Sequence, residues 1–78
     1  MKRIYSLNLI AYLRSEGFTE VGTGKDEEHG KVFYSFEETP AVTQAIKEYK
    51  NPQVQVNLHA FVSNFKDLKQ EIYAIRNA

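Results

Sequence analysis

The stretch that decides the fold is LHAFVSNFKDLKQEIYAI, residues 58–75. Its large apolar side chains recur at alternating steps of three and four residues: Leu58, Phe61, Phe65, Leu68, Ile72 and Ile75. Successive residues of an α-helix are turned by about 100°, so this spacing aligns the six side chains along one face. Val62 and Tyr73 widen that face to roughly 160°, whereas an ordinary surface helix shows about 100° to its core. The sequence therefore predicts a long amphipathic helix over 57–76 that either runs through the middle of the domain or also meets a second surface.

Residues 1–50 predict a β-α-β-β-α unit that precedes this helix. The expected strands are residues 2–5, 18–22 and 31–37. The first helix should be capped by Ser6 and ended by Gly17, and the second should begin at Thr39-Pro40. We expect residues 53–56 to be an extended connector or a short edge strand, after which Asn57 caps the long helix.

Together these elements predict an α+β fold for a single domain, residues 1–78. Its small antiparallel sheet would carry two packed helices, and the long C-terminal helix would pack across them or against another subunit. A chain of 78 residues buries only about 60 to 65% of its unfolded surface, and oligomerisation is a common source of additional stability.

Composition argues against several classes of protein. Ten basic and ten acidic residues give a net charge of zero, whereas nucleic-acid binders usually carry a strong basic excess. The sequence has no cysteine, so disulfide and thiolate chemistry are excluded. No apolar run reaches the ~18 residues of a membrane span, and we expect a cytoplasmic protein without a membrane partner.

Two blocks of the sequence resemble a family of short uncharacterised proteins from Gram-positive bacteria and their phages. The first block comprises Ile4–Ser6, Leu9–Leu13 and Glu16–Phe18, and the second comprises Phe36–Thr39 and Ala45–Tyr49. The resemblance covers about residues 3–50 and is to a domain of unknown function. It implies a setting of phage or mobile-element genes and provides no catalytic residues.

The segment Gly22-Thr23-Gly24-Lys25 invites comparison with a phosphate-binding loop. Such a loop needs a glycine five positions before its Gly-Lys pair and a Ser or Thr after the lysine. This sequence has Thr19 and Asp26 at those positions. We therefore interpret the segment as a hairpin turn.

The sequence also gives little support for a metal site or a general base. Asp26, Glu27, Glu28 and His29 are consecutive, whereas calcium loops place their carboxylates at alternate positions. A solvated turn is the favoured interpretation, and an acidic contact patch is the alternative. His59 has no acidic residue three or four positions away on its helix, so no oriented acid-base pair is predicted. We expect no metal, no cofactor and no enzymatic activity.

The sequence favours a small non-catalytic accessory protein that acts by binding another protein, with a homodimer as the expected assembly. One specific form is a phage host-takeover or anti-defence factor that binds a host protein. The hypothetical interface consists of Phe61, Val62, Phe65, Leu68, Lys69, Ile72, Tyr73 and Ile75. The alternative is a nucleic-acid-binding protein that uses either the aromatic residues of the sheet or the cations of the last two helices, with Tyr73 or Tyr12 stacking on a base. Those cations are Lys66, Lys69 and Arg76 on the last helix and Lys47 and Lys50 on the preceding one.

Overall fold

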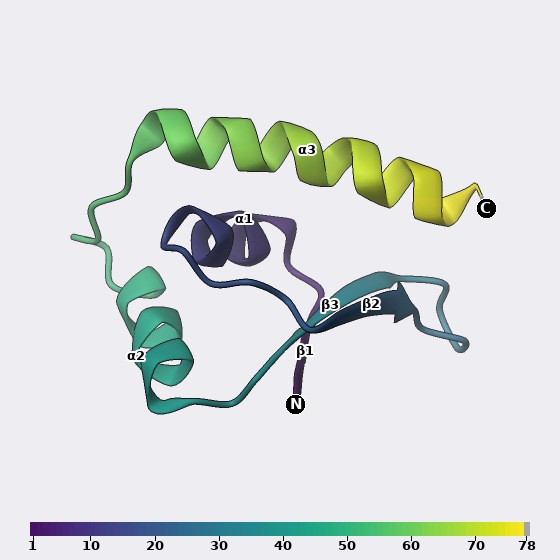
Figure 1. The fold of residues 1–78 in the computed structure, drawn as a ribbon, viewed down its shortest axis with the longest axis horizontal. Coiled ribbons are helices and arrows are strands. Elements are labelled where there is room, and N and C mark those ends of the chain that lie inside the picture. The colour runs from purple at the N-terminus through teal and green to yellow at the C-terminus, as the bar shows by residue number, and fades with distance from the viewer. Residues whose placement is uncertain (78) are drawn as a thin grey trace.

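The computed structural model describes residues 1–77 and contains three strands and three helices (Figure 1). Their order, β-α-β-β-α-α, confirms the predicted α+β fold. The elements are β1 (Lys2–Ile4), α1 (Leu7–Ser15), β2 (Gly22–Lys25), β3 (Val32–Phe36), α2 (Pro40–Tyr49) and α3 (Leu58–Arg76).

The predicted helix boundaries are confirmed by local hydrogen bonds. Three cap side chains accept a bond from a first-turn N–H group: Ser6 from Leu9 at 3.3 Å, Thr39 from Val42 at 3.1 Å, and Asn57 from Ala60 at 3.0 Å. Gly17 follows α1 with a φ of 92°, in the left-handed region that a side chain makes unfavourable. Short polar signals in the sequence thus fix where each helix begins.

The sheet is antiparallel, and its strand order is β1-β3-β2. In the central strand β3, Tyr34 is paired with Ile4 of β1 and with Thr23 of β2. All five residues of β3 are buried. Phe33 points to the face opposite Tyr34, where its ring lies 5.8 Å from the Tyr5 ring.

The predicted second strand over 18–22 is wrong, because β2 begins at Gly22 and continues to Lys25. The hairpin-turn interpretation of Gly22–Lys25 is therefore wrong as well, and the turn follows at residues 26–30. Backbone pairing with β3 places the strand here, and a Cβ on Gly24 would lie only 3.1 Å from the Phe33 ring. Glycine thus allows that ring to lie against β2.

Helix α1 lies between α3 and α2 in Figure 1. Its residues Ile10, Ala11, Tyr12 and Leu13 are all buried. The Tyr12 ring lies 5.4 Å from that of Tyr49 on α2, so Tyr12 is part of the core and cannot stack on a base as the alternative function supposed.

Helix α3 runs along the outside of the domain, and it is α1 that passes through the middle (Figure 1). Leu68 of α3 is fully buried, with 0% of its surface exposed. The apolar residues on either side of Leu68 along α3 are only partly buried against the core. Residues 53–56 contain no strand, so the edge-strand alternative for this segment is wrong; Gln53 belongs to the turn after α2, and 54–56 form the connector to α3.

Candidate binding groove

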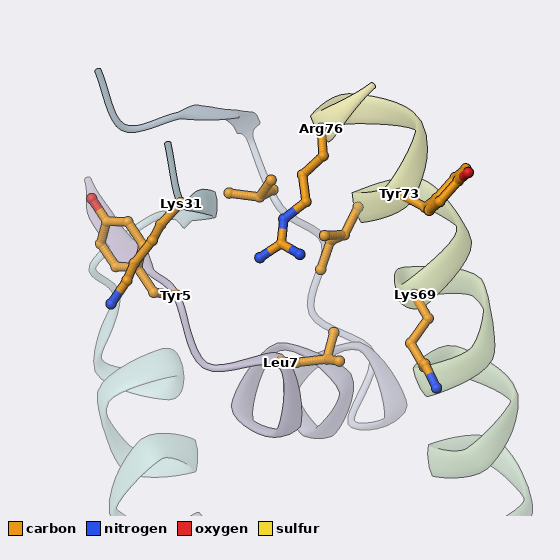
Figure 2. A pocket seen from close by; sticks show the side chains of 8 residues that line it. Tyr5, Leu7, Lys31, Lys69, Tyr73 and Arg76 are labelled. Atoms are coloured by element: carbon orange, nitrogen blue, oxygen red, sulfur yellow. The ribbon is translucent and has the colours of Figure 1, made fainter. Parts of the chain in front are cut away.

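A groove with a volume of about 490 Å³ lies beside the C-terminal half of α3 (Figure 2). The opposite side is formed by the chain between β1 and α1 and by the start of β3. The lining residues are Tyr5, Leu7, Lys31, Val32, Lys69, Ile72, Tyr73 and Arg76. We refer to these eight residues as the groove.

The groove combines an apolar floor with a cationic rim. Leu7, Val32 and Ile72 provide aliphatic surface. Three of the other lining residues, Lys31, Lys69 and Arg76, are cationic, and none of the described residues that line the groove is acidic. Such a surface can receive an apolar group and negative charge together.

Figure 2 shows that the cations come from two sides. Arg76 reaches from the end of α3 toward the middle of the groove, while Lys31 lies beside Tyr5 on the opposite wall. The Lys69 ammonium lies 5.9 Å from the centre of the Phe65 ring, so its aliphatic stem covers apolar surface of α3. The positive charge is therefore distributed around the rim.

The predicted interface residues divide into two groups. Leu68 is buried, and four more pack partly against the domain's own core: Phe61, Phe65, Ile72 and Ile75. Val62, Lys69 and Tyr73 are exposed, and Tyr73 exposes 71% of its surface. Steps of four and seven residues along the helix place these three on the same side as Leu58, which exposes 70% of its surface. We call Leu58, Val62, Lys69 and Tyr73 the α3 edge; its role as an interface stays a prediction.

A cluster of polar side chains fastens α3 to the rest of the domain. Arg14 of α1 donates to both carboxylate oxygens of Glu71 on α3, each bond measuring 2.9 Å. It also forms an ion pair with Glu20. The Tyr34 hydroxyl of β3 donates to Glu71 at 2.9 Å. We call these four residues the Arg14 cluster.

The pKa values in the Arg14 cluster favour its charged, hydrogen-bonded form. Hydrogen bonds from Arg14 hold the pKa of the Glu71 carboxyl below its usual value, against an opposing effect of burial. Burial, followed by the hydrogen bond to Glu71, raises the pKa of Tyr34 to about 12. The Glu71 carboxylate thus stays ionised and the Tyr34 hydroxyl stays protonated near neutral pH. The cluster positions α3, and with it one wall of the groove.

The other motifs of the sequence lie outside the groove. His29 and His59 are both exposed. In residues 1–77, no group of three or more His, Cys, Asp or Glu side chains is arranged to hold a metal ion. Asp26 accepts a bond from the Glu28 N–H at 2.8 Å, which makes the acidic segment a turn.

The sequence predicts no groove, although three residues of its hypothetical interface line one wall of it: Lys69, Ile72 and Tyr73. Tyr5, Leu7, Lys31 and Val32 come from distant parts of the chain, and no local signal marks them as neighbours of α3. The Arg14 cluster was missed for the same reason: Arg14 and Glu71 are 57 positions apart.

Comparison with known proteins gives a family without a known activity. The family described as a domain of unknown function (DUF5659) matches residues 2–74. No curated protein and no solved structure shows significant similarity to the chain. Within residues 1–77, no helix is both long enough and apolar enough to cross a membrane.

Proposed function

This chain belongs to the DUF5659 family, whose function is unknown, and from that premise we propose that it is a small non-catalytic protein that acts by binding another protein. The observation that carries this proposal is the groove. It offers apolar floor, aromatic side chains and cations within one concave surface of about 490 Å³. Tyrosine and arginine are enriched in protein interfaces and among the residues that contribute most to binding.

The sheet and the Arg14 cluster connect the walls of the groove. The start of β3 belongs to the central strand of the sheet, and the Arg14 cluster joins α3 to α1 and β3. A preorganised groove loses less conformational entropy on binding than a flexible one. The groove is therefore better suited to recognition than an exposed loop of similar composition.

The biological setting in this proposal is a phage or mobile element, with action on a host protein in the host cytoplasm. A host-takeover or anti-defence factor is the specific form that we propose. The support for this setting is the resemblance of residues 3–50 to short proteins of Gram-positive bacteria and their phages.

Capture of a partner from host lysate, followed by calorimetry with the purified partner, tests the proposal. Tyr73→Asp places a charge at the α3 edge. Because 71% of the tyrosine surface is exposed, we expect the variant to remain folded. We expect this variant to weaken partner binding at least tenfold, because it removes an aromatic contact and adds a negative charge beside the cations of the groove. Asp67→Asn, on the exposed side of the same helix, is the matched control and should bind normally. Equal binding by Tyr73→Asp and the wild type would refute the proposal.

We also propose that the chain forms a homodimer through Leu58 and Val62, the part of the α3 edge that lies outside the groove. Leu58 and Val62 extend the exposed apolar surface of α3 beyond the groove, and Val62 is 44% exposed. Sedimentation at micromolar concentration should give twice the 9.0 kDa mass of one chain. Val62→Asp should return the mass to that of a monomer without unfolding, whereas Asp67→Asn should not. A wild-type monomer would contradict this part of the proposal.

Nucleic-acid binding is the second candidate, and the cations and tyrosines at the groove favour it. Three phosphate contacts to a single strand would make affinity fall about 20-fold between ~50 and ~200 mM salt. Protein binding that uses the apolar floor should depend much less on salt. A titration with oligothymidylate at both salt concentrations therefore distinguishes the two candidates.

A further inference from the structure

The arrangement of charge around the groove restricts what it can bind. Three cationic side chains border an apolar floor, and no acidic residue is among the described residues that line it. Burying a cation against an uncharged partner would cost desolvation energy without compensation. A complementary partner therefore brings carboxylates or phosphates to the rim and an apolar group to the floor.

The positions of the cations argue against a single phosphate group. A phosphate is bound best by donors that converge on one point. In Figure 2, Lys31 and Arg76 approach from opposite sides, and Lys69 stands on the α3 rim. This arrangement suits negative charges that are separated by an apolar group.

The neighbourhood of Lys31 also argues against a long polyanion. The acidic turn of Asp26, Glu27 and Glu28 precedes it in the chain. The carboxylate of Asp26 lies 3.5 Å from the Tyr5 hydroxyl, at the side of the groove. A nucleic-acid strand that continued past this wall would meet like charge, whereas a short segment can end at Lys31.

We propose that the groove binds an acidic segment of the partner protein in which carboxylates flank a leucine or phenylalanine side chain; this rests on the proposed function. The apolar side chain contacts Leu7, Val32 and Ile72. The carboxylates pair with Arg76 and with the two lysines. Arg76 has the largest part because its planar guanidinium can donate two parallel hydrogen bonds to one carboxylate.

Fluorescence anisotropy with short labelled peptides tests this inference on the full chain. The probe peptide has glutamates on both sides of a Leu-Phe pair. A second peptide replaces each glutamate by glutamine, and a third keeps the glutamates but replaces Leu-Phe by Ser-Gly. We expect both changed peptides to bind at least tenfold more weakly, because charge and apolar contact both contribute.

Variants of the protein locate the binding site. Arg76→Gln should weaken binding of the acidic probe about fivefold, and Lys31→Gln about threefold. Lys66→Gln removes an exposed cation from the same helix outside the groove and should change nothing. Equal losses for Lys66→Gln and Arg76→Gln would overturn the inference, because they would show attraction by charge alone.

Two further results would also overturn it. The first is undetectable binding of the acidic probe at ~1 mM protein, and the second is tighter binding of an oligothymidylate of equal charge. These results test the acidic-segment inference separately from the proposed function. If the probe fails while Tyr73→Asp still weakens binding of the captured partner, the acidic-segment inference is wrong and protein binding stands. If Tyr73→Asp has no effect on that partner, the proposed function itself is wrong.

Discussion

Replacing Glu71 by glutamine tests how α3 is held in place. The substitution keeps the size of the side chain but removes the charge that accepts two hydrogen bonds from Arg14 and one from Tyr34. A hydrogen bond to a charged group contributes about 1.5–3 kcal/mol when buried. The Glu71 side chain is 42% exposed and Arg14 retains Glu20, so solvent screening reduces the total loss to about 1–2 kcal/mol.

Urea denaturation measures this loss. A domain of this size has a slope near 1 kcal/mol per molar urea, so the Glu71→Gln midpoint should fall by roughly 1–2 M. Asp67→Asn is the control, because Asp67 is an exposed acid on the same helix; its effect should stay within about 0.5 kcal/mol. A Glu71→Gln loss no larger than that of the control would refute the reasoning.

The same comparison has a defined pH dependence. The folded-state pKa of Glu71 lies below its usual value of 4.5, so the unfolded chain binds the proton more readily. The stabilisation is complete above pH ~4.5 and is lost as the pH falls through the folded-state pKa. The stability difference between the wild type and Glu71→Gln should therefore shrink in acid. A difference that stays constant down to pH ~3 would contradict the role assigned to Arg14.

Two more predictions concern the core. Leu68→Ala should destabilise the fold by about 2–4 kcal/mol because Leu68 is completely buried. Leu58→Ala, at a 70% exposed site, should cost less than about 1 kcal/mol. Thermal or urea unfolding of both variants measures the two losses, and equal losses would contradict the placement of α3. Tyr34 should ionise near pH 12 in an ultraviolet absorbance titration. Because the folded-state pKa of Tyr34 is raised, the stability that its hydroxyl provides is present below pH ~10 and is lost as the pH rises toward 12. Tyr34→Phe should remove the absorbance change near pH 12, and an unchanged titration curve would contradict the assignment.

Local sequence signals predicted the elements of this fold well. Caps at Ser6, Thr39 and Asn57 and the apolar spacing of 58–75 depend on neighbours within one or two helical turns. They can therefore be read without knowledge of the tertiary structure. Strand β2 was misplaced because Gly22 and Gly24 have low strand propensity, and only pairing with β3 and contact with Phe33 hold them extended.

The groove and the Arg14 cluster could be predicted only in part. The width of the apolar face of 57–76 correctly indicated more surface than one core contact requires, and Val62 and Tyr73 are indeed exposed. Which residues lie opposite α3 depends on how α1 and β3 pack against it. Lys31 and Arg14 are separated from their α3 neighbours by most of the chain, and an isolated charged residue gives no sign of a distant partner.

A heteronuclear NMR titration of the isotope-labelled chain tests the central claim, which is that the groove is a binding surface for a protein segment. The ligand is the acidic peptide with glutamates around a Leu-Phe pair. We expect saturable shifts of the backbone amides near Leu7, Lys31 and Tyr73, with α2 unaffected because none of its residues lines the groove. Shifts that are absent, or that centre on α2 instead of the groove, would contradict the account.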